Sequence, residues 1–184
     1  STTTCVTVKA DINLGERDLL RVGSELQRYR LDDWWTASGG GMGPLSFQNI
    51  DDGKRDRTAL FAEWEARLSP RWQTLTSVRY ERVRTDAGAV HGYRTTGTNT
   101  GNQISEAAAF NALDRKKSDD NWDFAALARH THDESLDVEF GVARKVRSPN
   151  LYERYTWSSW AMAATMNNFV GDGNGYVGDV DLRP

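Results

Sequence analysis

A glycine-rich stretch near the C-terminal end, GDGNGYVGDVD (171–181), contains residues whose spacing could bind a metal ion. Oxygen atoms of four side chains could surround a hard cation such as Ca²⁺: Asp172, Asn174, Asp179 and Asp181. Tyr176 stands where an EF-hand loop would place its third ligand, and the distant glutamate of that motif is missing. The stretch therefore fits either a weak calcium site or a turn cluster of residues that tolerate positive φ.

Two further sets of residues could bind a transition metal. His130 and His132 are separated by one residue in a predicted turn without an evident third ligand, which favours solvated histidines. Thioethers select Cu(I), and the chain has three methionines, all in predicted long loops: Met42, Met162 and Met166. The sequence has no nucleophile elbow, no phosphate-binding glycine loop and no His–carboxylate–Ser grouping. We therefore predict no enzyme activity and no cofactor besides the candidate Ca²⁺.

The segment RKVRSPNLYERYTWSSW (144–160) places four large aromatic residues in a polar stretch broken by proline. Aromatic rings with one apolar and one polar edge are typical of membrane interfaces and of ligand-binding surfaces. We expect Tyr152 at an interface. The rings expected to contact a ligand are Trp34, Trp35, Tyr155, Trp157 and Trp160.

The composition excludes several classes of protein. The net charge of -3, with basic residues scattered among acids, predicts no nucleic-acid partner. Cys5 is the single cysteine, so no intrachain disulfide forms. The mean hydropathy is -0.67, and no apolar run approaches 18 residues, which excludes a transmembrane helix. A membrane β-barrel stays open, because its strands need only about ten alternating residues each.

Six segments alternate between apolar and polar residues, which predicts strands with two different faces. Their approximate limits are 5–14, 19–30, 58–68, 72–84, 121–130 and 136–147. The polar face carries charges that a dry core would not accommodate. A water-filled lumen would accommodate the charged residues on this face: Glu25, Glu63, Glu65, Arg67, Arg79 and Glu81. The alternative is an exposed sheet that is packed on one face and solvated on the other.

Short and long connections alternate strictly between these segments. Tight turns follow the first, third and fifth, whereas long loops cover 31–57, 85–120 and the region from Ser148 onward. An up-and-down sheet then carries all its long loops at one end, as outer-membrane barrels do. We therefore predict an all-β fold: an antiparallel up-and-down sheet of about six strands, part of a transmembrane β-barrel.

The run Arg147-Ser148-Pro149-Asn150-Leu151-Tyr152-Glu153 resembles a motif of TonB-dependent outer-membrane receptors, in which a strand ends in Arg-x-Pro-Asn-Leu-Tyr-Glu before a long external loop. That loop commonly closes on Leu-x-Pro-Glu, and this chain ends in Leu182-Arg183-Pro184. The resemblance implies a closed barrel of about 22 strands with an N-terminal plug. We expect residues 1–184 to form part of the barrel, near its C-terminal end, and to contain no plug.

The resemblance also implies a function. The parent protein would lie in the bacterial outer membrane, in contact with its lipid, and would take up siderophore-iron, haem, copper or a similar scarce nutrient. The long loops would capture this small-molecule or metal-chelate ligand, and TonB would act through the plug. The competing hypothesis is a soluble antiparallel β-rich binding module that stacks carbohydrate on Trp34, Trp35, Trp157 and Trp160.

Overall fold

The computed structural model describes residues 1–39, 41–97, 100–168 and 170–184. Its strands are β1 (Thr2–Asn13), β2 (Asp18–Trp35), β3 (Phe47–Ser69), β4 (Trp72–Asp86), β5 (Lys117–Thr131) and β6 (Asp137–Arg144). Its helices are the 3₁₀ turn η1 (Thr100–Asn102), α1 (Gln103–Asn111), α2 (Leu151–Tyr155) and α3 (Ala161–Met166). Among the described residues, no helix is both long and apolar enough to cross a membrane.

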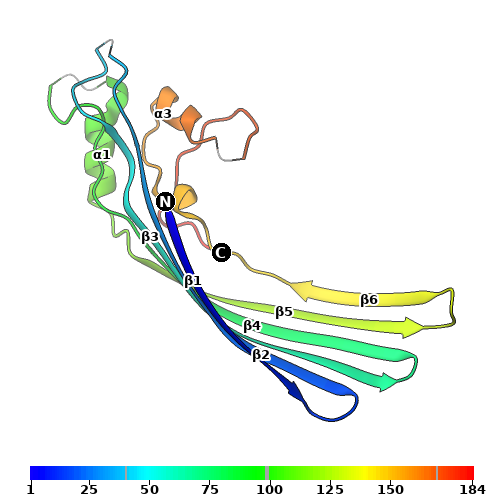
Figure 1. Cartoon of the computed structure of the whole chain (residues 1–184). Coiled ribbons are helices and arrows are strands. Elements are labelled where there is room, and N and C mark those ends of the chain that lie inside the picture. Colours follow the sequence, from blue (N-terminus) through cyan, green and yellow to red (C-terminus); the bar gives the residue numbers. More distant parts are fainter. Residues whose placement is uncertain (40, 98–99, 169) are drawn as a thin grey trace.

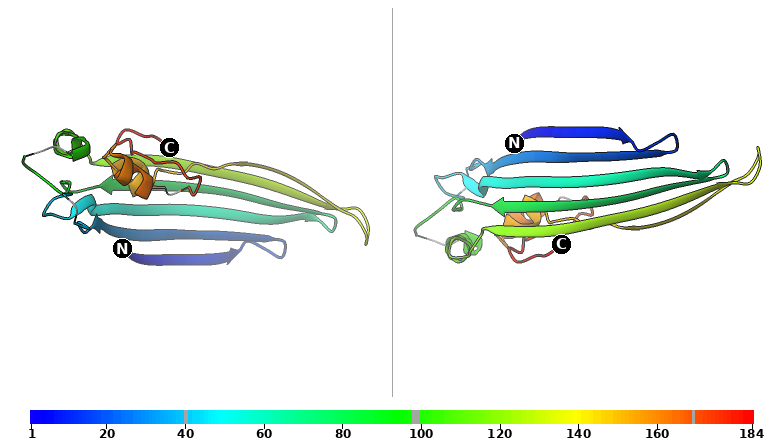
Figure 2. Two further views of the ribbon diagram at one scale, coloured as in Figure 1. Left: turned by 90° about the horizontal axis from the view of Figure 1, so that it is seen from above. Right: turned by 90° about the horizontal axis from the view of Figure 1, so that it is seen from below.

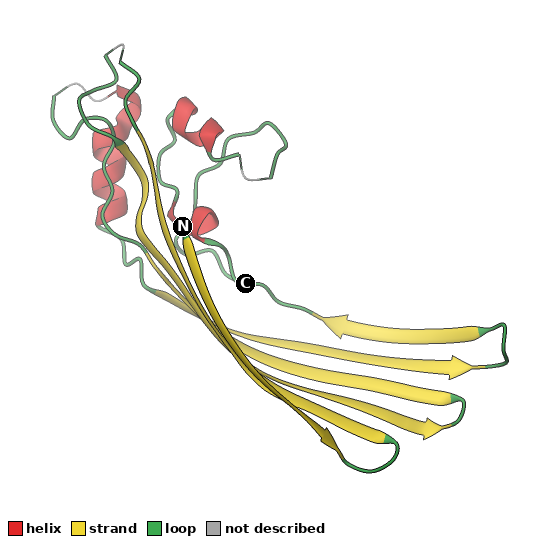
Figure 3. Ribbon diagram, in the orientation of Figure 1, coloured by secondary structure: helices red, strands yellow, loops and turns green. Residues whose placement is uncertain are grey.

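The six strands form one curved sheet in chain order, and each strand is antiparallel to the next (Figure 2). The tight turns lie together at one end, and the helices and long loops lie at the other (Figure 3). The segment that carries α2 and α3 folds back onto the inside of the curve (Figure 1). The predicted up-and-down sheet is therefore confirmed as an open sheet, of the kind expected for part of a barrel.

Strands β2 and β3 are longer than the alternation predicted. Most of the expected loop between Leu31 and Arg57 is wrong, because β2 continues to Trp35 and β3 already begins at Phe47. Arg30 and Asp56, which face each other diagonally across this extension, form an ion pair of 2.6 Å. The alternation stops here because the outward face carries charges instead of apolar residues. The strands nevertheless continue.

Strand β6 is shorter than predicted. It ends at Arg144, and the amide of Val146 donates to Oδ1 of Asp123 at 2.8 Å instead of joining the sheet ladder. The chain then crosses to the inside of the curve, where Pro149 follows with no amide to donate. Beyond this point the upper part of β5 is paired only with β4.

One face of the sheet is apolar and exposed, as on the lipid-facing side of a barrel. The exposed side chains include Val6, Val8, Leu26, Leu60, Val78, Phe124, Phe140 and Val142. Trp72 packs on His130 near the tight turns, and Tyr80 packs on Trp122 near the loops. Trp72 and Tyr80 are about 26 Å apart along β4 at ~3.3 Å a residue. A tilt of ~40° reduces this to about 20 Å, close to the height of a membrane apolar band.

The opposite face is a network of ion pairs. Arg21 contacts Glu63 at 2.6 Å and Glu65 at 3.3 Å, near the tight turns. Closer to the loops, two arginines share two glutamates, with distances between 2.6 and 3.5 Å: Arg57, Arg79, Glu25 and Glu81. These carboxylates and guanidinia neutralise one another across three strands, so the face needs no dry core. Arg67, expected on this face, is exposed near the turn.

Candidate functional site

The motif that resembles a receptor signature builds the start of α2. The side chain of Asn150 accepts from the amide of Glu153 at 2.9 Å, and the Glu153 carboxylate accepts from the amide of Asn150 at 2.7 Å. This reciprocal capping box satisfies two amides that the helix itself leaves without partners. Arg147 donates two hydrogen bonds of 2.9 Å to the same carboxylate and so lowers the pKa of Glu153. The motif therefore fixes where the strand region ends and the loop helix begins.

Two other motif residues hold α2 against the sheet. Leu151 is buried against β3, where a side-chain carbon at Gly53 would lie only 3.1 Å from its Cδ1 atom. Glycine at position 53 therefore lets the helix approach the strand closely. Tyr152 is partly buried, and burial together with nearby Asp33 raises its pKa to about 12. The motif residues thus pack inward in this structure.

Arg154 ties α2 to two strands and to the C-terminal segment. Its Nη2 atom donates to both carboxylate oxygens of Asp119 on β5, and its Nη1 atom donates to the Thr85 hydroxyl on β4. The same guanidinium donates to the backbone carbonyl of Leu182 at 2.9 Å. Arg154 is 2% exposed, so the pair lies where water competes little for its hydrogen bonds.

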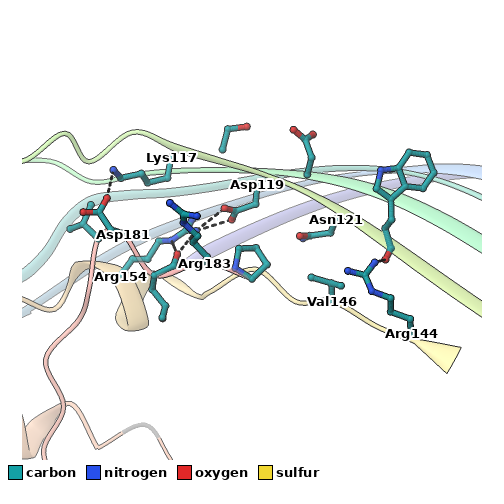
Figure 4. A pocket seen from close by; sticks show the side chains of 14 residues that line it. Lys117, Asp119, Asn121, Arg144, Val146, Arg154, Asp181 and Arg183 are labelled. Carbon is teal, nitrogen blue, oxygen red and sulfur yellow. Dashed lines mark hydrogen bonds and ion pairs between the residues drawn. The ribbon is translucent and has the colours of Figure 1, made fainter.

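A hollow of about 890 Å³ lies beside the Arg154–Asp119 ion pair, between the loop end of β5 and the C-terminal segment (Figure 4). Lys117 pairs with Asp181 at 2.8 Å on one side of it, and Arg144 lies on the other. Arg144 donates to the carbonyl of Trp122 at 3.1 Å, in the region that β6 no longer covers. Side chains thus partly replace the missing strand pairing along this edge.

Residues from the loop ends of β2 and β3 and from the segments that follow β4 and β6 form one buried cluster, which we call the loop core: Leu31, Phe47, Ile50, Ala87, Val90, Tyr93, Ala107, Phe110, Leu151, Tyr155, Trp157, Ala163 and Val180. Phe47 lies at its centre. The rings of Trp35 and Trp157 stack on Phe47 with centroid distances of 5.0 and 4.9 Å. Trp160 meets the ring of Tyr93 edge-on at 6.0 Å.

The expectation that Tyr155 and Trp157 expose their rings is wrong. Tyr155 is fully buried, donates to the Arg115 carbonyl at 2.7 Å, and has its pKa raised to about 12 by burial. Trp157 donates its indole proton to the carbonyl of Gln48 at 2.9 Å. Both rings are needed to fill the space between loops, which is why they are not on the surface. Trp34 is 53% exposed, and Trp35 and Trp160 are partly buried, so these three rings remain candidates for ligand contact.

The residues considered for calcium have separate partners. Asp172 accepts from the amide of Asn174 and from the hydroxyl of Tyr176, an arrangement typical of a turn. Asp181 is paired with Lys117, and Asp179 accepts from the amide of Asp181. In the described ranges no group of three or more His, Cys, Asp or Glu side chains could hold a metal ion. The geometry therefore favours the turn cluster over the calcium loop.

Sequence reasoning missed the groups that fasten the loops to the sheet. Arg154, Asp119 and Thr85 are far apart in the chain and only meet in the folded protein. The available signal was composition: 18 of the 23 basic residues are arginine, which favours planar, two-pronged pairing with carboxylates. That signal predicts the kind of contact but identifies no residue.

Comparison with protein families identifies the class to which this architecture belongs. The family model described as TonB dependent receptor-like, beta-barrel matches residues 3–184. The chain therefore belongs to the family of TonB-dependent receptor β-barrels, and the resemblance inferred from the motif is confirmed. Members of this family are bacterial outer-membrane receptors that act as transporters rather than enzymes. No curated protein and no solved structure matches the chain.

Proposed function

We propose that this chain forms part of the wall of an outer-membrane receptor that imports a scarce nutrient, such as siderophore-iron, haem or copper, with energy from TonB. The observation that carries the proposal is the division of one sheet into an apolar exposed face and a charged inner face. A lipid bilayer accepts the first, and a water-filled lumen accepts the second.

The loop end of the sheet supports a role in ligand capture. Trp34 and Trp160 keep accessible ring surface there, whereas Tyr155 and Trp157 support the loops from within. Polar groups and aromatic edges around a packed scaffold are typical of binding surfaces. In this proposal a nutrient first meets the loops and then passes along the charged wall, while TonB acts through a plug supplied by the parent protein.

A genetic experiment tests the proposal. Cells that lack the full-length receptor would be grown on ferric citrate, on haem or under limiting copper, with and without functional TonB. Growth on one of these nutrients that requires both the receptor and TonB supports the proposal. Fractionation should place the full-length protein in the outer membrane. Unchanged growth in all three media, or recovery of the receptor outside that membrane, contradicts it.

A further inference from the structure

Arg55 occupies a distinctive position on the inner wall. It lies on β3 between Tyr29 of β2 and Thr85 of β4, and it shares its face with Arg57. Gly53, two residues nearer the loops on the same face, lies against Leu151 of α2. Arg55 is therefore among the first wall residues below the loop core, and it lines a hollow of about 580 Å³ that opens onto the inner face.

The charge of Arg55 is not compensated by the groups around it. Among the described residues its guanidinium makes no hydrogen bond or ion pair, and its buried Nε atom has no partner. The carboxylate that attracts the Arg55 guanidinium is that of Glu81, and it already forms ion pairs with Arg57 and Arg79. The neighbouring guanidinia have acids of their own, in the pairs Arg147–Glu153 and Arg154–Asp119.

The hydrogen-bond donors around this hollow exceed the acceptors. The Nε atom of Arg57 is also buried without a partner. Lys145, from the segment after β6, lines the same hollow and adds a further positive charge. The carboxylates that line it, Glu25, Glu81 and Asp123, already accept from Arg57, Arg79 and the amide of Val146. A half-buried guanidinium without an acceptor is unfavourable, whereas its planar fork matches a carboxylate through two hydrogen bonds.

We infer that Arg55, with Arg57 and Lys145, forms a binding site for a carboxylate group of the imported solute, at the level where the solute leaves the loops and enters the lumen. This inference rests on the proposed function, because it requires a solute that passes along this wall. It adds to the proposed function the chemical class of the solute, because the nutrient or its chelator would carry at least one carboxylate. It also identifies the side chain that binds this group.

Citrate binding to the purified full-length receptor in detergent tests the site. Isothermal titration at low ionic strength would compare wild type with Arg55→Gln, Arg55→Lys and the control Arg67→Gln, an exposed arginine on the same strand. We expect Arg55→Gln to weaken citrate binding by about tenfold or more, because a charge-assisted hydrogen bond is lost. Arg55→Lys keeps the positive charge but loses the two-pronged guanidinium, so its affinity for citrate should lie between those of wild type and Arg55→Gln. Arg67→Gln should match wild type.

Two results overturn the inference. Wild type and Arg55→Gln could bind citrate equally well or not at all. Alternatively, Arg55→Gln could lower the melting temperature of the receptor while citrate binding stays unchanged, which would assign the partner carboxylate to the protein itself. Citrate binding to the purified receptor does not depend on TonB. A receptor that binds citrate through Arg55 but supports no TonB-dependent growth would contradict the proposed function and leave the anion site in place.

Discussion

The Nη2 atom of Arg154 lies 2.8 Å from Oδ1 and 2.9 Å from Oδ2 of Asp119, and both side chains are nearly excluded from solvent. This contact joins a loop helix to the edge of a strand that is paired on one side only at that height. A buried ion pair of this kind adds little net stability when intact, but losing one partner leaves an unpaired buried charge. Its main effect is therefore to fix one position of α2 over the sheet.

Removing this carboxylate should loosen the third loop. We expect Asp119→Ala to cost about 3–5 kcal/mol of local stability, since Arg154 stays buried without its acid. Limited proteolysis of the full-length receptor, with cleavage mapped within residues 145–184, measures the effect. Asp120→Ala is the matched control. Asp120 is the next residue along β5, and its ion pair with Arg82 lies on the exposed face of the sheet. Equal cleavage in the two variants would contradict the assignment.

The capping box predicts a dependence on pH. The pKa of Glu153 lies below its ordinary value of 4.5, because Arg147 donates to it. Its stabilising effect on α2 is therefore complete above pH 4.5 and is lost as the pH falls through the lowered pKa. Hydrogen exchange at residues 151–155, corrected for intrinsic rates, should rise as the pH is lowered below 4.5. Arg147→Gln should reduce this dependence. A wild-type helix whose exchange does not respond to acid would refute it.

The stacked rings predict opposite outcomes for two tryptophans. Trp157→Ala removes a ring that stacks on Phe47 and a hydrogen bond to Gln48, and we expect a loss of about 3–5 kcal/mol within the loop core. Trp34→Ala should leave the loop core intact, because its ring is exposed. Proteolysis of the loops separates the two variants. If Trp34→Ala opens the loops as readily as Trp157→Ala, the assignment of buried and exposed rings is wrong.

Adjacent residues on β4 test which face meets lipid. Val78 lies on the apolar exposed face, and Ser77 lies opposite Glu63 on the charged face. Val78→Arg near the middle of the membrane should cost about 2–4 kcal/mol, whereas Ser77→Arg would gain a partner in Glu63. The fraction of full-length receptor that refolds into lipid vesicles, followed by heat-modifiable migration on gels, reports the difference. Equal refolding yields for Val78→Arg and Ser77→Arg would contradict the assignment of the Val78 face to lipid.

The alternation of apolar and polar residues was sufficient to predict the sheet where one face meets lipid and the other meets water. It failed above the apolar band, where Arg30 and Asp56 show that both faces are polar although the strands continue. The prediction for the rings failed for a different reason. Whether Trp157 is exposed depends on Phe47 and Gln48, which contact its ring from a distant part of the chain. Local sequence carries no information about such partners.

The loop core has a consequence for how the outer end of the wall can move. The backbone of Leu45 in the first loop donates to Tyr93 in the second, and Glu106 in the second accepts from Ser158 in the third. The indole of Trp157 in the third loop donates to the carbonyl of Gln48 at the start of β3, directly after the first loop. No loop can swing away without breaking the contacts of the other two. Because each loop is hydrogen-bonded to both of the others, we expect the three loops to move together rather than singly.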